Sequence, residues 1–382
     1  MLNIVFIGRN IHFLSSASGS AVLPREIIKC VYKDLNVSIV TIDDKLTELR
    51  KLHEKTYDWF NDVVSKINIF SISEDEAFTK RIKSIYTLLK NGEFDIIHIF
   101  DSLPVHYLPF IHKITRFCGS KVIFNLTMPT PKSVSITRSV LLKRYTNGMI
   151  ASSPYLLHDY LINSNMISQI VPPPVDLSVY KFSNINRETI PDKFSILYIG
   201  PLDFRRFPLK VIPLVASMAK CVNLRIVLAP RFENDLHRIR TLLKIIRRNN
   251  FKGNVEITYG RVSHESKILL YRSADAVIFP FLKSYRGAVD PPLTLLESLA
   301  CNGLVLATDV LGIPWIIKDN YNGFLSASIE QLFSKIKYLS ENKNNNNIKK
   351  IRLNALNTVK EKFSPSLVRN KLLAFYTEML KY

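Results

Sequence analysis

The order of expected strands and helices repeats in the two halves of this 382-residue chain, and this repetition restricts the fold most strongly. An apolar run at residues 2–7, a serine- and glycine-containing loop, a helix starting at Pro24 and an apolar run at 37–42 begin the first half. Short apolar runs that alternate with helical segments predict a parallel sheet covered by helices, and hence an α/β fold. Further strands are expected at residues 95–100, 121–126, 148–152, 194–199, 224–229, 255–259, 276–279 and 304–308.

Three prolines at 172–174, followed by polar residues, interrupt this alternation and indicate a linker. We therefore expect a Rossmann-like domain at 1–175, a linker at 176–193 and a second Rossmann-like domain at 194–364. A C-terminal helix at 365–382 is expected to pack back on the first domain. Two doubly wound α/β domains that face a central cleft would bind ligands at the carboxyl ends of their strands.

The formal net charge of +20 favours anionic partners, namely nucleic acid, an anionic membrane surface or phosphate-bearing substrates. No nucleic-acid recognition motif is present and the basic residues are spread along the chain, so nucleic acid ranks below the other two. Residues 105–117 and 139–145 mix aromatic with basic side chains and would suit an anionic lipid surface, although ordinary core helices with a solvated face explain them equally well. No apolar run approaches the roughly 18–20 residues of a membrane span, so we expect a cytoplasmic protein, peripheral on the membrane at most.

The four cysteines are scattered without a C-x-x-C pair, which suits a reducing compartment and gives no zinc or disulfide pattern. Cys301 is expected to be a small packed hydrophobic residue. His98 lies within an apolar strand and is expected to be a core residue.

Residues 289–303 carry the clearest functional pattern. Two adjacent prolines start an apolar helix, so the N–H groups of Leu293 and Thr294 just beyond them lack helical partners. Such a helix start is an anion site that suits a diphosphate. Glu297 lies about one turn further along, where its carboxylate could accept hydrogen bonds from sugar hydroxyls.

This segment, with residues 309–314 and 320–323 after it, resembles the nucleotide-sugar site of family 4 glycosyltransferases, which are retaining enzymes of the GT-B fold. The resemblance is strongest from about 260 to 323, moderate at 196–208, and weak in the first half. It implies two Rossmann-like domains, with the acceptor on the first and the sugar donor on the second.

In the family an E-x7-E motif spans this loop and helix, and its second glutamate binds the donor ribose; that position is Glu297 here. The first glutamate position falls on Val289, whose neighbour Asp290 would contact the donor sugar from a loop shifted by one residue. Two alternatives remain open: that carboxylate is absent from the site, or Asp290 only caps the helix before Pro291.

The family holds the donor diphosphate with an arginine and a lysine after a strand, and these positions fall on Pro201 and Arg206 here. Arg206 is the expected catalytic cation, with Arg205 as a neighbouring donor contact; the alternative is two solvated surface arginines. Gly19 occupies the place of the family's glycine-rich loop, and Arg286 lies on a loop that faces the cleft in relatives. The histidine that the family often has near the reacting sugar is replaced by residues 125–127.

The resemblance therefore implies transfer of a sugar from a nucleotide diphosphate donor to a glycan acceptor, with retention of configuration. The charge suits a lipid-linked oligosaccharide acceptor, used in protein glycosylation or surface polysaccharide assembly. No D-x-D motif is present, and neither a metal nor another cofactor is expected, because helix N-termini and basic side chains can carry the leaving diphosphate. Two alternatives stay open: a catalytically inactive GT-B scaffold that binds a glycan or a partner protein, which Val289 and Pro201 favour, and a nucleic-acid binder.

Overall fold

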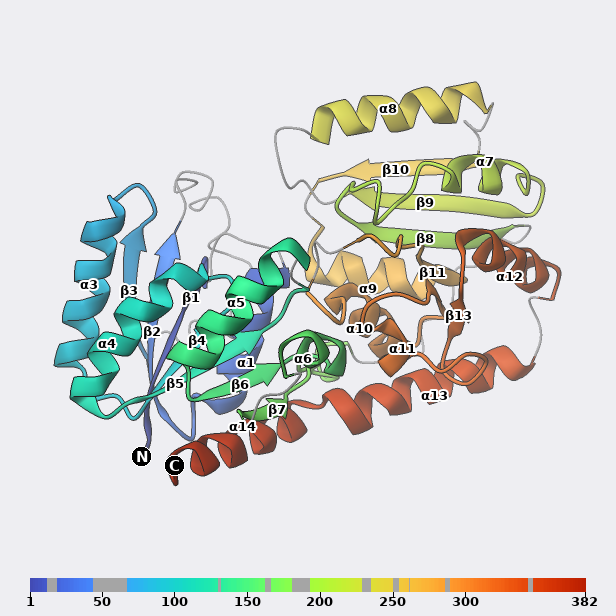
Figure 1. Ribbon diagram of the computed structural model, residues 1–382. Helices are drawn as coiled ribbons and strands as arrows, with labels where there is room; N and C mark the ends of the chain where they lie inside the picture. The colour runs from blue at the N-terminus through green and yellow to red at the C-terminus, as the bar shows by residue number, and fades with distance from the viewer. Residues whose placement is uncertain are drawn as a thin grey trace. The chain divides into compact units, whose positions relative to one another are not determined.

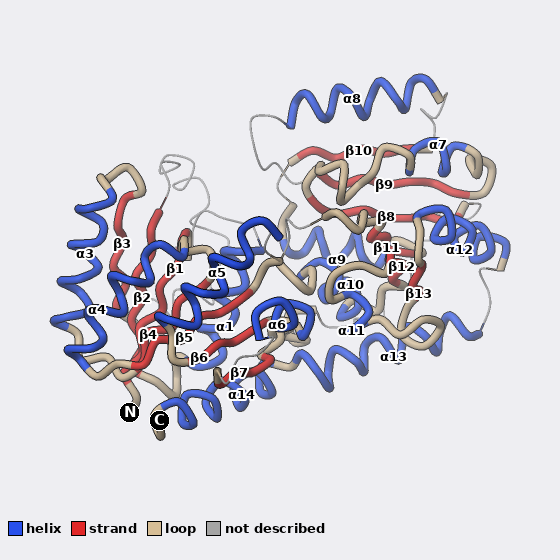
Figure 2. The backbone as a smooth tube through the Cα atoms, in the orientation of Figure 1, coloured by secondary structure: helices blue, strands red, loops and turns tan. Residues whose placement is uncertain are grey.

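The computed structural model of the chain divides into two compact units (Figures 1 and 2). Unit 1 comprises Met1–Pro174, Arg286–Asp290 and Phe363–Tyr382, and unit 2 comprises Val175–Tyr285 and Pro291–Lys362. The structure describes residues 1–11, 19–43, 67–129, 132–161, 166–180, 193–228, 235–249, 254–260, 262–285, 289–342 and 346–382.

Unit 1 contains a seven-stranded parallel sheet in the order β3-β2-β1-β4-β5-β6-β7. The strand order changes direction between β1 and β4, as it does in doubly wound sheets, and the carboxyl ends at such a point are where these folds bind ligands. The strands are β1 (Asn3–Arg9), β2 (Asn36–Asp43), β3 (Asn68–Ser73), β4 (Ile96–Phe100), β5 (Lys121–Leu126), β6 (Gly148–Ala151) and β7 (Ile167–Ile170).

Helices cover both faces of this sheet. On one face, α3, α4 and α5 bury Ile85, Ile111 and Leu142 in a single apolar cluster with side chains from the strands. On the other face, α1 and α14 contact each other, and Tyr376 of α14 reaches His98 of β4. The helices of unit 1 are α1 (Gly19–Val31), α3 (Phe78–Asn91), η2 (Val105–Tyr107), α4 (Leu108–Cys118), α5 (Lys132–Tyr145), α6 (Pro154–Leu161) and α14 (Pro365–Met379).

Unit 2 contains a six-stranded parallel sheet in the order β10-β9-β8-β11-β12-β13, with its change of direction between β8 and β11. Its strands are β8 (Phe194–Gly200), β9 (Val222–Leu228), β10 (Val255–Tyr259), β11 (Ala276–Phe279), β12 (Val305–Thr308) and β13 (Phe324–Ser326). Its helices are α7 (Val211–Ala216), α8 (Asp235–Arg248), α9 (His264–Ser273), α10 (Leu293–Ala300), α11 (Ile313–Ile316), α12 (Ile329–Glu341) and α13 (Asn346–Phe363).

The predicted fold class is confirmed: both units are doubly wound parallel α/β sheets. Strands β3, β7 and β13 were not predicted from the sequence, and each of them lies at the edge of its sheet. An edge strand is shielded on fewer sides, so it does not need a continuous apolar run; β3, for example, is mostly exposed or half-buried.

Two boundaries also differ from the prediction. Helix α1 begins at Gly19 rather than at Pro24, which lies inside the helix although proline favours the first turn. Val289 and Asp290 belong to unit 1, whereas the sequence analysis assigned them to the second domain. Most of the expected linker, residues 181–192, lies outside the described residues.

His98 is fully buried in unit 1 and hydrogen-bonds through Nδ1 to the Tyr376 hydroxyl at 2.7 Å. Burial lowers the pKa of His98 from 6.5 to about 3, because the charged imidazolium would lose its hydration. The unfolded chain therefore binds a proton that the folded chain does not, at any pH between these two values. The contribution of His98 to stability is fully present above pH 6.5 and is lost progressively as the pH drops toward 3.

We predict that the buried neutral His98 lowers the free energy of unfolding by about 1.4 kcal/mol for each pH unit below 6.5. His98→Gln should remove this pH dependence. Urea unfolding at several pH values between 6.5 and 4 measures the slope. Tyr376→Phe is the control: it lowers stability but keeps the slope, since the imidazole stays buried. Equal slopes for the wild type and His98→Gln would show that the prediction is wrong.

Candidate functional site

Helix α10 begins without a side-chain cap. Its N-cap is Pro292, whose carbonyl accepts the N–H groups of Leu295 and Leu296 at 3.0 and 3.4 Å. The N–H groups of Leu293 and Thr294 precede these first helical bonds, and the first turn contains no acidic residue. The start of α10 thus carries uncompensated positive charge from the backbone.

The end of α10 is fixed by a close backbone approach. Asn302 takes a left-handed conformation with φ 59°, and the N–H of Gly303 donates to the carbonyl of Ser298 at 2.8 Å. A Cβ atom at position 303 would lie only 2.7 Å from that carbonyl oxygen, so glycine is required there. This explains why the helix ends abruptly at this point.

Arg206 brings a side-chain cation to the start of the same helix. Its side chain is almost buried, with the residue 7% exposed, and its Nη2 lies 3.4 Å from the Thr294 hydroxyl. The guanidinium also lies over the Phe281 ring, 5.1 Å from the centroid. Among the described residues no carboxylate comes within ion-pair distance of Arg206, and its Nε has no hydrogen-bond partner. A buried cation without a counter-charge is costly, and a bound anion would relieve that cost.

The position of Arg206 follows from the sheet topology of unit 2. Its loop follows β8, and Phe281 follows β11, the two strands between which the sheet changes direction. The Leu282 N–H donates to the Arg205 carbonyl at 2.7 Å and joins these two loops. A Cβ atom at Gly200 would lie 3.2 Å from Cζ of Arg206, so glycine leaves room for the guanidinium.

Arg205 has a different environment from its neighbour. Its side chain is 56% exposed and forms an ion pair with Asp203 at 3.1 Å. The alternative of a solvated surface arginine therefore describes Arg205 but not Arg206.

Glu297 is held by two side chains of α9. Both of its carboxylate oxygens accept from Lys267 Nζ, at 2.9 and 3.0 Å, and Oε2 also accepts from the Tyr271 hydroxyl at 3.0 Å. Burial, together with the Glu297 charge, raises the pKa of Tyr271 well above its ordinary value, so the phenol stays a hydrogen-bond donor. Lys267 and Tyr271 were not predicted from the sequence, although their four-residue spacing after the helix cap Ser263 places both on one side of α9.

Asp290 lies in unit 1 and is fully buried. Its carboxylate accepts from the Ser153 hydroxyl, its carbonyl accepts from the Ser152 hydroxyl, and its N–H donates to the Thr127 carbonyl at 2.8 Å. These bonds to residues that follow β5 and β6 explain why the segment belongs to unit 1. Asp290 is not a helix cap, since Pro292 holds that position in α10.

A second buried acid, Asp101, follows β4 in unit 1. It accepts the hydroxyl and the N–H of Thr127, the latter at 2.7 Å, and the N–H of Met128 at 2.9 Å. Burial raises the pKa of Asp101, and Arg138 at 3.7 Å and these hydrogen bonds oppose the shift only in part. Thr127 thus bonds both Asp101 and Asp290. Asn125, at the place of the family histidine, is buried, and neither polar atom of its side chain has a partner among the described residues.

Three other expected residues have simpler outcomes. Gly19 is the first residue of α1, and Arg286 lies outside the described residues. Cys301 is buried, which raises the pKa of its thiol to about 12, as expected for a packed residue rather than a nucleophile.

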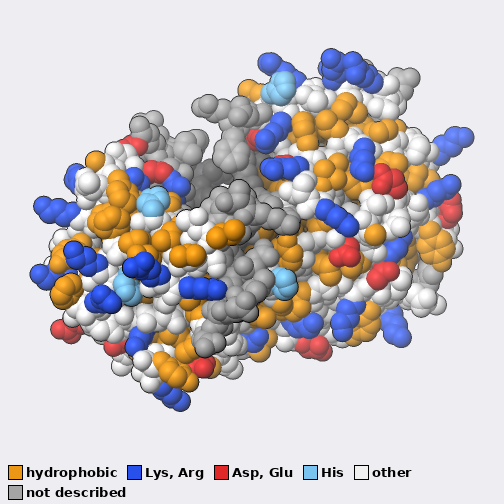
Figure 3. Space-filling view, viewed as in Figure 1, with side chains coloured by type: hydrophobic (Ala, Val, Ile, Leu, Met, Phe, Trp, Pro, Cys, Tyr) orange, Lys and Arg blue, Asp and Glu red, His pale blue; other side chains and the backbone are white. Residues whose placement is uncertain are grey.

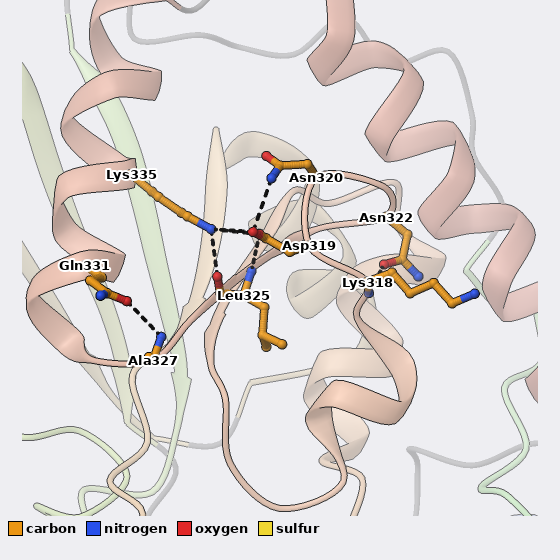
Figure 4. Close-up of polar contacts among 8 residues, drawn as sticks. All are labelled: Lys318, Asp319, Asn320, Asn322, Leu325, Ala327, Gln331 and Lys335. Atoms are coloured by element: carbon orange, nitrogen blue, oxygen red, sulfur yellow. Dashed lines mark hydrogen bonds and ion pairs between the residues drawn. The ribbon is translucent and has the colours of Figure 1, made fainter.

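The segment that follows α11 forms a turn with its own internal bonds (Figure 4). Asn322 accepts the Lys318 N–H at 2.7 Å, and Asp319 accepts the Leu325 N–H at 2.8 Å and pairs with Lys335 at 2.7 Å. The Asn322 amide also donates to the carbonyl of Ile316 at 2.8 Å. These residues hold β13 beside β12, so the segment 320–323 has a structural role.

We predict that Glu297 and Lys267 are coupled by about 1–3 kcal/mol in a double-mutant cycle of Glu297→Gln and Lys267→Met, because both side chains are largely shielded from water. Urea unfolding measures the four proteins. The exposed pair Lys210–Glu330, at 2.7 Å, is the control and should couple by less than about 1 kcal/mol. Equal coupling in the two pairs would contradict the prediction.

Comparisons with known proteins agree with this geometry. Residues 193–342 match the family model described as "Glycosyl transferases group 1", and this range includes Arg206 and all of α10. An uncharacterised glycosyltransferase of Methanocaldococcus jannaschii is 27% identical over 182 residues, which cover 47% of this chain and only 43% of that protein. The narrower family 4 assignment stays a prediction.

Solved structures resemble the whole chain. A glycosyltransferase from Rickettsia africae has a TM-score of 0.77 at 18% identity, covering 100% of this chain and 99% of its own. Anabaena HepE in complex with UDP-glucose has a TM-score of 0.77 at 14% identity, covering 99% and 100%. The fold is therefore GT-B, and the segment 193–342 of unit 2 is a group 1 glycosyltransferase domain.

Proposed function

We propose that this protein is a glycosyltransferase that moves a sugar from a uridine diphosphate sugar to a glycan acceptor. The observation that carries the proposal is the nearly buried Arg206 without a carboxylate partner among the described residues, beside the uncapped start of α10. Support comes from the matched glycosyltransferase segment around both features, and from the similar Anabaena protein that was solved with UDP-glucose.

In this proposal the bond between the donor sugar C1 and the β-phosphate oxygen breaks, and the electron pair remains on the diphosphate. The N–H groups of Leu293 and Thr294 and the guanidinium of Arg206 bind that developing charge. The acceptor hydroxyl oxygen forms the new bond to C1, and its proton passes to the departing diphosphate or to water. We propose that no metal is required, since this cationic site already neutralises the leaving group.

Glu297 is the proposed ribose ligand. Lys267 and Tyr271 fix its carboxylate without occupying all of its acceptor positions, because two oxygens offer about four lone-pair sites and three contacts are present. Asp290 is proposed to contact the donor sugar, and the retaining outcome is part of the same proposal.

The acceptor is proposed to be a lipid-linked oligosaccharide bound by unit 1 at the cytoplasmic face of a membrane, for protein glycosylation or surface polysaccharide assembly. The net charge of +20 supports an anionic environment of this kind. The buried polar groups of Asn125 and Asp101 at the carboxyl edge of the unit 1 sheet support a polar ligand there.

A catalytically inactive scaffold is the second candidate. Val289 stands where the family has its first glutamate, and Asp290 is fully buried against Ser153. Such a protein would bind a nucleotide sugar without turning it over.

We predict that Arg206→Ala weakens UDP binding by about 10- to 100-fold, because a charge-assisted hydrogen bond contributes about 1.5–3 kcal/mol. Arg205→Ala is the matched control and should change affinity by no more than about twofold, since that side chain pairs with Asp203. Isothermal titration with UDP measures both. An equal loss in the two variants would point to general charge attraction rather than to a built site.

We further predict that the protein consumes a UDP-sugar, and that EDTA leaves the rate unchanged. A panel of UDP-sugars, assayed for UDP release with a lipid-linked glycan fraction as acceptor, measures this directly. UDP binding without turnover of any sugar would support the scaffold, and a rate abolished by EDTA and restored by Mg²⁺ would contradict the metal-independent mechanism.

A further inference from the structure

Helices α3, α4 and α5 form one layer of unit 1, with α4 in contact with both of the others (Figure 1). Their sequences contain four, two and four Lys or Arg residues, and none contains Asp or Glu. The three helices share one face of the sheet, and their charged side chains are all basic, so the layer they form is positively charged. We refer to it as the α3–α5 face.

Two ion pairs offset part of this charge. Lys80 pairs with Glu76 at 3.3 Å just before α3, and Arg138 lies 3.7 Å from the buried Asp101. Lys83, Lys113 and Arg116 are exposed, and none of the described carboxylates lies within ion-pair distance of them. The face therefore keeps a substantial positive charge at its surface.

The same layer exposes large apolar side chains. Phe117 of α4 is 81% exposed and Ile136 of α5 is 77% exposed. Tyr86, Phe110 and Val140 on these helices are also exposed. Apolar and basic side chains are interleaved over this part of the molecule (Figure 3). On α4, Phe110, Lys113 and Phe117 recur at helical spacing, so both kinds of side chain point away from the sheet on the same side.

We propose that the α3–α5 face docks on an anionic lipid bilayer. Its basic residues would approach the lipid phosphates, and Phe117 and Ile136 would enter the boundary between headgroups and acyl chains. In the described part of the chain no helix is long and apolar enough to span a membrane.

The mixture of side chains favours lipid over nucleic acid. Phosphate backbones would account for the basic residues, and aromatic rings can stack on bases. Aliphatic side chains such as Ile136 and Val140 cannot stack on bases in this way, whereas a bilayer can bury them. A comparison surface exists in unit 2, where α8 exposes Arg240, Lys244 and Arg247.

This inference extends the lipid-linked acceptor of the proposed function, but it rests on the chemistry of the face alone. Vesicle binding requires neither a sugar donor nor an acceptor glycan. The docking proposal and the transfer proposal can therefore each fail without the other.

The test is co-sedimentation of the full chain with phosphatidylglycerol vesicles and with phosphatidylcholine vesicles. The charge variant is Lys83→Glu/Lys113→Glu/Arg116→Glu. Its control is Arg240→Glu/Lys244→Glu/Arg247→Glu, which changes the net charge equally on α8. The apolar variant is Phe117→Ser/Ile136→Ser, with Leu236→Ser/Leu353→Ser as its control on exposed leucines of unit 2. Thermal unfolding verifies that all four variants are folded.

We expect binding to the anionic vesicles that weakens as salt increases, since mobile ions screen the attraction. The charge variant should bind at least about a hundredfold more weakly, at about fivefold for each basic residue removed, and the apolar variant about tenfold more weakly. Both control variants should bind the anionic vesicles with an affinity within about threefold of the wild type, since a change in net charge has only a small general effect. Three results would each overturn the proposal: no binding to anionic vesicles, an equal loss in both charge variants, or tight binding to polyuridylate with none to vesicles.

Discussion

The guanidinium of Arg206 beside the first turn of α10 is the interaction on which the functional account of this protein depends. Two positive features meet there, a side-chain cation and the unpaired N–H groups of a helix start, and neither has an acid partner among the described residues. Proteins normally compensate buried charge. An uncompensated pair of this kind, where a doubly wound sheet changes direction, is best explained by an anionic ligand.

The surroundings of this pair are built to keep it in place. Phe281 supports the flat face of the guanidinium, Gly200 leaves room for it, and the Leu282–Arg205 backbone bond joins the loops after β8 and β11. One turn further along α10, Lys267 and Tyr271 hold Glu297. These groups lie on helices of unit 2 or on loops joined to its strands, and such rigid support is what precise binding of a charged ligand requires. In unit 1 the basic residues are instead spread over the exposed layer of α3, α4 and α5, with apolar residues between them.

The sequence was sufficient for the fold class, because buried parallel strands require apolar runs that can be read directly. The edge strands β3 and β7 escaped prediction because partial exposure removes that requirement, and β13 escaped because it has only three residues, although two of them are buried. Within the site, the helix start at Leu293 could be predicted from local sequence, whereas Arg206 was expected from the resemblance to the family. The separation of Arg206 from Arg205, and the pairing of Glu297 with Lys267, depend on contacts between segments distant in the chain. The same holds for Asp290, whose place in unit 1 is set by Thr127, Ser152 and Ser153.

A crystal structure of the protein with UDP would test the central claim most directly. The account predicts that the diphosphate oxygens lie within hydrogen-bond distance of the Leu293 and Thr294 N–H groups and of the Arg206 guanidinium, with the ribose hydroxyls at Glu297. A diphosphate bound elsewhere, for instance at Arg205 or along α8, would contradict it, because the charge at the start of α10 would then have no ligand to explain it.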